Sequence, residues 1–263
     1  MKGGFVKVAA GVCIPLLMMF AATAQGEDVF WRIDPSVKSC SMNISPNLTQ
    51  DQFHRYVKQV SLILSNKSSA AAPTLGKNHY GLNLDYSFTP VNQHDLAWIN
   101  TFVHPDEDCP LGNTIQLPVL RAGYGISDTV DIGLLYSNSM VANYSLLGAE
   151  VKHAFVKGSE TVPAISSRVS MMRLLGVADY SIDIISLDVL ASKNWGKIIP
   201  YAGLRGSYTI GAETTDKVSL SSEYIFDMQP YLGFVYPYRN FRLAVEYDIA
   251  EVSTLDLNLG FQF

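Results

Sequence analysis

The sequence has little charge and lacks long apolar runs beyond its N-terminus. Asp, Glu, Lys and Arg make up 16% of its 263 residues, compared with roughly 25% in a typical soluble protein. After residue 24, no segment stays apolar for the roughly 20 residues that a transmembrane helix needs. Together with 14 Tyr and 12 Phe, this composition argues against a bundle of transmembrane helices and favours a membrane β-barrel.

Basic patches and enzyme motifs are also lacking. The chain holds 19 Lys and Arg against 24 Asp and Glu and has no basic stripe, so we expect no nucleic-acid partner. The motifs G-x-S-x-G, H-E-x-x-H and a glycine-rich phosphate loop do not occur. Only His94 and His104 fall in an expected long loop beside several acids, which leaves a rim hydrolase as a weak alternative. We therefore expect no catalytic residue, no cofactor and no metal.

The N-terminus has the pattern of a secretory signal. Lys2 and Lys7 flank the start of an apolar stretch at residues 8–22, and small residues at 22–24 suit cleavage. We expect residues 1–24 to be a signal peptide that is removed after export. Residues 25–77 would then form an N-terminal extension of the mature protein.

A period of three to four residues predicts one amphipathic helix in this extension. Apolar residues recur at Phe53, Tyr56, Val57, Val60 and Leu64. Thr49 and Gln52 have the spacing of a capping box, in which each side chain bonds the backbone N–H of the other residue. These signals predict a helix over about residues 50–65, followed by a linker of small residues that ends at 77.

From residue 78 onward the apolar residues recur every second position, which is typical of strands whose two faces meet different surroundings. The last segment, "LDLNLGFQF", alternates in this way to the final residue. Short connections alternate with longer ones, and two long ones fall near 90–114 and 211–223. The pattern predicts an all-β fold, a transmembrane antiparallel up-and-down barrel of about ten strands over 78–263. A further hairpin within 90–114 would make twelve.

One predicted strand, "YSIDIISLDVLA", breaks the alternation because Asp183 and Asp188 cannot share a face of a regular strand. Two alternatives remain open from the residues alone. Either a bulge lies near Ile184 and Ile185, or Asp183 lies at the wet end of the strand.

The closing strand and two internal segments carry a family resemblance. Leu259, Phe261 and Phe263 alternate up to the C-terminal residue, and "IPYAGLRGSY" and "YGISDTVDIGLLY" are turn-strand units of the same style. Residues 78–263 thereby resemble small, porin-like bacterial outer-membrane β-barrel proteins. The resemblance implies a Gram-negative outer membrane, contact with its lipid, and a barrel-assembly machinery that recognises the closing strand. It implies no particular activity, because such barrels serve many functions.

Charged residues on the polar faces of the predicted strands should line the lumen, since a basic residue facing lipid costs about 2–4 kcal/mol. They are Asp85, Arg121, Asp131, Glu150, Lys152, Arg168, Asp188, Arg205, Arg242, Glu246, Asp248 and Asp256. Two interpretations remain: the charges pair and fill the lumen, or they line a small water path. The little space within ten strands favours a closed or narrow lumen.

Cys40 and Cys109 are the two cysteines outside the predicted signal peptide. In an oxidising compartment they suggest a disulfide. Such a bond would draw the N-terminal extension through the lumen, with its helix as a plug. Two unpaired thiols or a bond between molecules are the alternatives.

Three functions follow from these expectations. The first is a porin-like or structural barrel whose lumen the N-terminal extension plugs. The second is an anchoring or binding module, in which the helix docks a periplasmic or surface partner through the face of Phe53, Tyr56, Val57 and Val60. The rim hydrolase is the third and weakest.

Overall fold

A computed structural model describes residues 41–103, 113–139, 143–159 and 161–263. The expected signal peptide, Cys40, Cys109 and His104 lie outside these described residues. Within them, no helix is long and apolar enough to cross a membrane.

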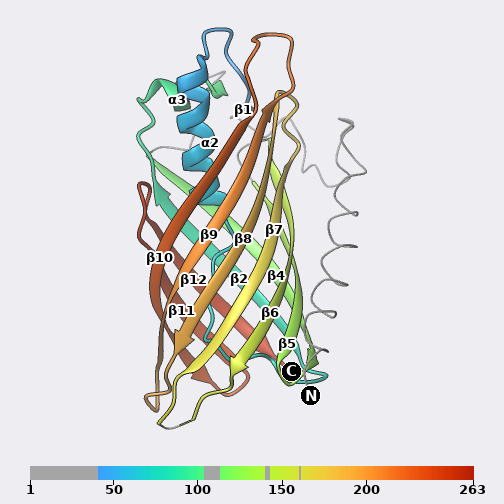
Figure 1. The fold of residues 1–263 in the computed structure, drawn as a ribbon, viewed down its shortest axis with the longest axis vertical. Helices are drawn as coiled ribbons and strands as arrows, with labels where there is room; N and C mark the ends of the chain where they lie inside the picture. Colours follow the sequence, from blue (N-terminus) through green and yellow to red (C-terminus); the bar gives the residue numbers. More distant parts are fainter. Residues whose placement is uncertain (1–40, 104–112, 140–142, 160) are drawn as a thin grey trace, which may run out of the picture. The chain divides into compact units, whose positions relative to one another are not determined.

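Ten antiparallel strands form a closed barrel in which each strand pairs with its neighbours along the chain (Figure 1). They are β2 (Tyr80–Pro90), β4 (Thr114–Ser127), β5 (Val130–Asn138), β6 (Ser145–Val156), β7 (Ala164–Leu175), β8 (Tyr180–Ser192), β9 (Ile199–Glu213), β10 (Glu223–Tyr238), β11 (Phe241–Asp248) and β12 (Thr254–Gln262). β12 pairs with β2 and closes the barrel. The predicted up-and-down barrel is confirmed with ten strands; β2 pairs directly with β4, so a further hairpin does not enter the wall.

The two faces of each strand differ in exposure as the alternation predicts. In β12, Leu255, Leu257 and Leu259 point outward and are 41–51% exposed. Asp256 and Asn258 point inward and are buried. The barrel therefore has an apolar outer face and a covered interior.

Asp183 lies on the outward face of β8. The pairings of β8 with β7 and β9 run without a shift of register, so the alternative of a bulge near Ile184 and Ile185 is wrong. The other alternative agrees with the position of Asp183, the fourth residue of β8, near the end of the strand. Asp183 instead accepts a hydrogen bond of 2.6 Å from Nε of Arg173, on the neighbouring strand β7. The ion pair allows a carboxylate on the outward face, close to the loop that joins these strands.

The two ends of the barrel have connections of different length. At one end, the long-loop end, residues 91–113 join β2 to β4 and residues 214–222 join β9 to β10. At the other, the short-turn end, two residues join β4 to β5 and two join β10 to β11. The C-terminal residue Phe263 also lies at the short-turn end, where its N–H donates to the carbonyl of Tyr80.

Two helices and a small sheet complete the described fold. Helix α2 (Gln50–Leu64) begins with the predicted capping box of Thr49 and Gln52. The short helix α3 (Leu96–Ile99) belongs to the 91–113 connection, as does β3 (Phe102–Val103). β3 pairs with β1 (Ser41–Met42) at the long-loop end. The chain then runs through α2 and the linker to the start of β2 at the short-turn end.

Candidate functional site: the barrel interior

The N-terminal segment is defined here as residues 43–77, and its middle part occupies the interior of the barrel. Residues 60–70 are buried without exception, and they contact inward-facing side chains of several strands. The interior has two zones. An apolar zone surrounds α2 towards the long-loop end, and a charged zone surrounds the extended linker towards the short-turn end.

The apolar zone is a hydrophobic core built from the wall and one face of α2. The α2 side chains are Phe53, Tyr56, Val57, Val60, Leu62, Ile63 and Leu64. The wall side chains include Ile115, Leu117, Val119, Leu135, Leu146, Met172, Leu174, Tyr180, Ile182, Ile184 and Ile225. Because Phe53, Tyr56 and Val57 are fully buried, the prediction that this face docks a partner is wrong.

Specific contacts fix α2 against strands β8 and β9. The hydroxyl of Tyr56 lies 2.5 Å from that of Tyr180, and its ring packs edge-on against Trp98 with centroids 5.2 Å apart. A Cβ on Gly211 would lie 2.7 Å from a methyl group of Val57. Glycine at this position of β9 therefore allows the helix to approach the wall.

Sequence reasoning missed the apolar wall, although a signal for it was present. In the segments "QLPVL" and "MMRLL", near the long-loop end, the inward-facing residues are apolar: Leu117, Val119, Met172 and Leu174. A strand with lipid on one side and water on the other would not need this pattern. Apolar residues on the inner face indicate that another apolar element covers them.

Arg205 is the centre of the charged zone. Its guanidinium is fully buried and contacts three carboxylates. The distances are 3.0 Å to Asp188, 2.8 Å to Asp248 and 3.2 Å to Glu246. Lys67 of the linker lies 3.4 Å from the second oxygen of Asp248. A buried charge is stable only with such partners.

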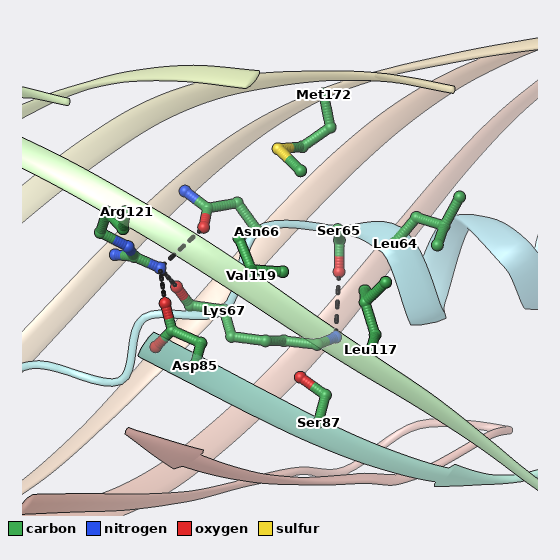
Figure 2. Close-up of a pocket in the computed structure, with 10 residues that line it drawn as sticks. All are labelled: Leu64, Ser65, Asn66, Lys67, Asp85, Ser87, Leu117, Val119, Arg121 and Met172. Atoms are coloured by element: carbon green, nitrogen blue, oxygen red, sulfur yellow. Dashed lines mark hydrogen bonds and ion pairs between the residues drawn. The ribbon is translucent and has the colours of Figure 1, made fainter. Parts of the chain in front are cut away.

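Two further arginines of the wall bind the backbone of the linker. Arg121 donates to the carbonyl of Lys67 at 2.8 Å, and Arg168 donates to the same oxygen at 2.7 Å. Arg168 also donates to the carbonyl of Asn66 at 3.0 Å. Figure 2 shows Arg121 directed at Asn66, Lys67 and Asp85, on the opposite side of the drawn residues from Leu64.

Acidic side chains bind the backbone N–H groups that follow. Glu246 accepts from the N–H of Ser68 at 2.9 Å and from that of Ser69 at 2.6 Å. Tyr201 donates a third hydrogen bond to the same carboxylate. Asp256 accepts from the hydroxyls of Ser69 and Ser87. Side chains of the wall thus form hydrogen bonds with successive backbone C=O and N–H groups of the linker.

The structure brings the twelve predicted lumen residues into this charged zone. Those under 9% exposed are Asp85, Arg121, Asp131, Arg168, Asp188, Arg205, Glu246, Asp248 and Asp256. Glu150, Lys152 and Arg242 are partly buried. Lys67 belongs to the same network but was missed, because a lone lysine in a linker has no strand pattern. The excess of acids over bases among the twelve was the one sign that a further cation was needed.

Little free space remains where the two zones meet. A cavity of about 10 Å³ lies between Leu64, Lys67, Leu117 and Arg121 (Figure 2), which is about the room that one water molecule needs. A larger hollow of about 670 Å³ opens at the short-turn end beside Pro73 and Trp195. The middle of the interior is therefore filled.

Two histidines, His94 and His54, lie at the long-loop end and make polar contacts there. His94 is exposed, and its N–H donates to the side chain of Asn92 in a turn. His54 pairs with Glu223 at 2.7 Å on the surface of the long-loop end. In the described part of the chain, no group of three or more His, Cys, Asp or Glu could hold a metal ion. His104 and the acids beside it lie outside the described residues.

Comparisons with known proteins show similarity of fold. No family model matches the chain, and no curated protein does. Solved structures that match include the translocator domain of the autotransporter NalP from Neisseria meningitidis. The sequence identity is 11%, the match covers 81% of this chain and 95% of the NalP domain, and the TM-score is 0.40. The outer membrane protein OprG from Pseudomonas aeruginosa matches with 12% identity, 72% and 98% coverage, and a TM-score of 0.31.

The attachment invasion locus protein Ail of Yersinia pestis, solved in complex with the heparin analogue sucrose octasulfate, also matches. Its identity is 12%, the coverage is 71% and 99%, and the TM-score is 0.33. The solved structures that match are those of bacterial outer-membrane β-barrel proteins, while the closed barrel of this chain is established by its own strand pairings.

Proposed function

We propose that the protein is an exported bacterial outer-membrane β-barrel whose lumen is closed by its own N-terminal segment, and that it serves as a structural barrel, not as an open porin or an enzyme. The observation that supports this proposal most is the filled interior. An apolar core and a paired charge network follow each other along the barrel, and both involve the N-terminal segment.

The outer face supports a location in lipid. Large apolar side chains on several strands, such as Leu84, Leu134, Phe226, Leu232 and Leu243, are each 48–66% exposed. In water, a continuous apolar belt of this kind would drive aggregation. In a bilayer it meets hydrocarbon, which is the usual surrounding of such a belt.

The orientation follows from the two ends. Outer-membrane barrels place short turns in the periplasm and longer loops outside. The closing strand with Leu259, Phe261 and Phe263 would then end in the periplasm. There the barrel-assembly machinery would meet it, after export by the signal peptide of residues 1–24. Removal of Phe263 should slow assembly and leave the finished barrel nearly as stable.

Conductance in planar lipid bilayers tests the closed lumen. The full chain, refolded and shown to be inserted by its heat-modifiable migration, should give no steady ion current. The matched control is Ser61→Cys with Thr209→Cys, because these two hydroxyls are in contact between α2 and β9. A steady current that disappears on forming this cross-link would overturn the proposal, since the N-terminal segment would then be a mobile gate.

We also propose that Cys40 and Cys109 form the intramolecular disulfide expected from the sequence. Ser41, which follows Cys40, pairs with Val103 of the connection that contains Cys109. The bond would hold the N-terminal segment at the long-loop end. Mass spectrometry of peptides digested without reduction should find the linked pair, and two free thiols would contradict it.

A further inference from the structure

We infer that the N-terminal segment carries the chain across the membrane inside the barrel, so that residues 43–51 are displayed on the cell surface while Phe263 stays in the periplasm. The inference rests on the proposed function for the membrane and its orientation. It goes beyond closure, because a plug could also enter and leave the lumen on the periplasmic side.

The first part of the crossing is the attachment at the long-loop end. The N–H groups of Asn43 and Ser45 donate to the carbonyls of Thr101 and Asn100, at 3.0 and 2.8 Å. Ile44 donates to the carboxylate of Asp179, in the connection between β7 and β8, at 2.8 Å. Residues 43–45 are therefore bound to two different connections at this end of the barrel.

A second attachment at this end uses side chains of α2. Arg55 pairs with Asp95 at 2.9 Å, and Lys58 pairs with Glu251 at 2.9 Å. Asp95 and Glu251 belong to different connections, 91–113 and 249–253. The start of α2 is thereby held among the long loops.

The middle of the crossing is the passage through both zones of the interior. α2 contacts β8, β9 and β10 on the way. Lys152 then donates to the carbonyls of Ala71 and Pro73, at 2.6 and 2.9 Å, on the far side of the charged zone. The segment does not turn back, because its contacts progress from the long loops to the short turns.

The exit is at the short-turn end. The N–H of Leu75 donates to Asp131 at 2.8 Å, and Gln262 of the closing strand donates to the carbonyl of Leu75 at 2.9 Å. The N–H of Asn78 donates to the carbonyl of Gly125 at 2.8 Å. Two residues later β2 begins, so a single pass of the chain connects the two ends of the barrel.

The path of the N-terminal segment through the barrel places its first residues on the surface of the long-loop end. Pro46, Asn47 and Thr49 are exposed at the long-loop end, and the side chain of Asp51 is 83% exposed. The loops that hold them are fixed to α2 by ion pairs, so these residues form part of an ordered surface. A peptide inserted at Asn47 should accordingly be displayed outside the cell.

Cysteine labelling of intact cells tests the inference. In a full-length Cys40→Ser, Cys109→Ser background, three variants carry one new thiol each: Asn47→Cys in the N-terminal segment, Ser219→Cys in the 214–222 loop, and Lys197→Cys in a short turn. All three positions are exposed. A bulky PEG-maleimide, which does not cross the outer membrane, should label the first two thiols on intact cells and the third only after lysis. Heat-modifiable migration shows that each variant is folded, and Asp51→Cys replaces Asn47→Cys if that variant fails to assemble.

The outcomes separate this inference from the proposed function. Labelling of Ser219→Cys without labelling of Asn47→Cys on intact cells would overturn the crossing and leave the barrel and its orientation intact. Labelling of Lys197→Cys in place of Ser219→Cys would overturn the orientation itself. Labelling of both Asn47→Cys and Ser219→Cys, with Lys197→Cys protected, supports both.

Discussion

The apolar zone and the charged zone fill the same barrel by different means. In the apolar zone, the wall presents Leu, Ile and Met to a helix, and the contacts are mainly between hydrocarbon groups. In the charged zone, the wall presents Arg, Lys, Asp and Glu to an extended chain, and the contacts are ion pairs and hydrogen bonds.

The conformation of the filling segment explains this difference. A helix satisfies its own backbone N–H and C=O groups, so α2 can lie against an apolar wall. The extended linker has no such internal bonds, and each buried backbone group without a partner would cost free energy. Arg121, Arg168, Lys152 and Glu246 supply those partners. The charges of the interior therefore serve the backbone of the linker as well as each other.

Arg205→Ala should give the largest loss of stability. It leaves Asp188, Glu246 and Asp248 without their shared cation in a buried site, and removing one partner of a buried ion pair costs about 3–5 kcal/mol. Urea unfolding in lipid vesicles measures the change. Because the penalty is electrostatic, adding Asp248→Asn should restore part of the loss. An unchanged midpoint for Arg205→Ala would contradict the network.

Ile63→Ala should give the next largest loss of stability. Ile63 is buried in the apolar zone, and truncating a buried Ile to Ala costs about 2–5 kcal/mol. Here the loss should follow side-chain volume, so Ile63→Val should cost only about 0.5–1.5 kcal/mol in the same measurement. If Ile63→Val were as harmful as Ile63→Ala, the zone would not be packed as a hydrocarbon core.

Leu257→Arg tests whether lipid covers the outer face of the barrel, in contrast to the two inner zones, which the N-terminal segment covers. Its side chain points outward from β12, and a basic residue near the bilayer midplane costs about 2–4 kcal/mol. The loss should be seen in refolding into lipid vesicles. Leu257→Met is the control and should refold like the natural chain. Equal refolding of Leu257→Arg would mean that lipid does not cover this face.

The smallest change in stability should come from Glu251→Gln, in the 249–253 connection at the long-loop end. The hydrogen bond from Lys58 holds the pKa of Glu251 below its usual value. Because this pKa is lower in the folded state than in the unfolded state, the carboxylate stabilises the fold at pH values above the unfolded pKa, near 4.3. This contribution is lost as the pH falls through the folded-state pKa. Glu251→Gln should therefore remove a small part of the acid sensitivity between pH 5 and 3, without changing stability at pH 7 by more than about 1 kcal/mol.

Much of the wall could be predicted from local patterns. The alternation of Leu257, Asn258 and Leu259 depends only on residues next to one another, and so does the capping box at Thr49. Asp183 could not be placed in this way, because its position depends on Arg173 in the neighbouring strand. The role of Lys67 was likewise hidden, because Asp248 lies 181 residues further along the chain.

The sequence by itself determined the strands, their two faces, the helix and the charges that avoid lipid, because these depend on periodicity and on the solvent of each face. Only the tertiary structure decided that α2 and the linker lie within the barrel and in which direction they pass through it. The physical reason is that an amphipathic helix and a run of inward-facing charges each need a partner, and the pattern of neither one shows where that partner lies. Closure of the barrel brings α2 to its apolar wall and Lys67 to Asp248.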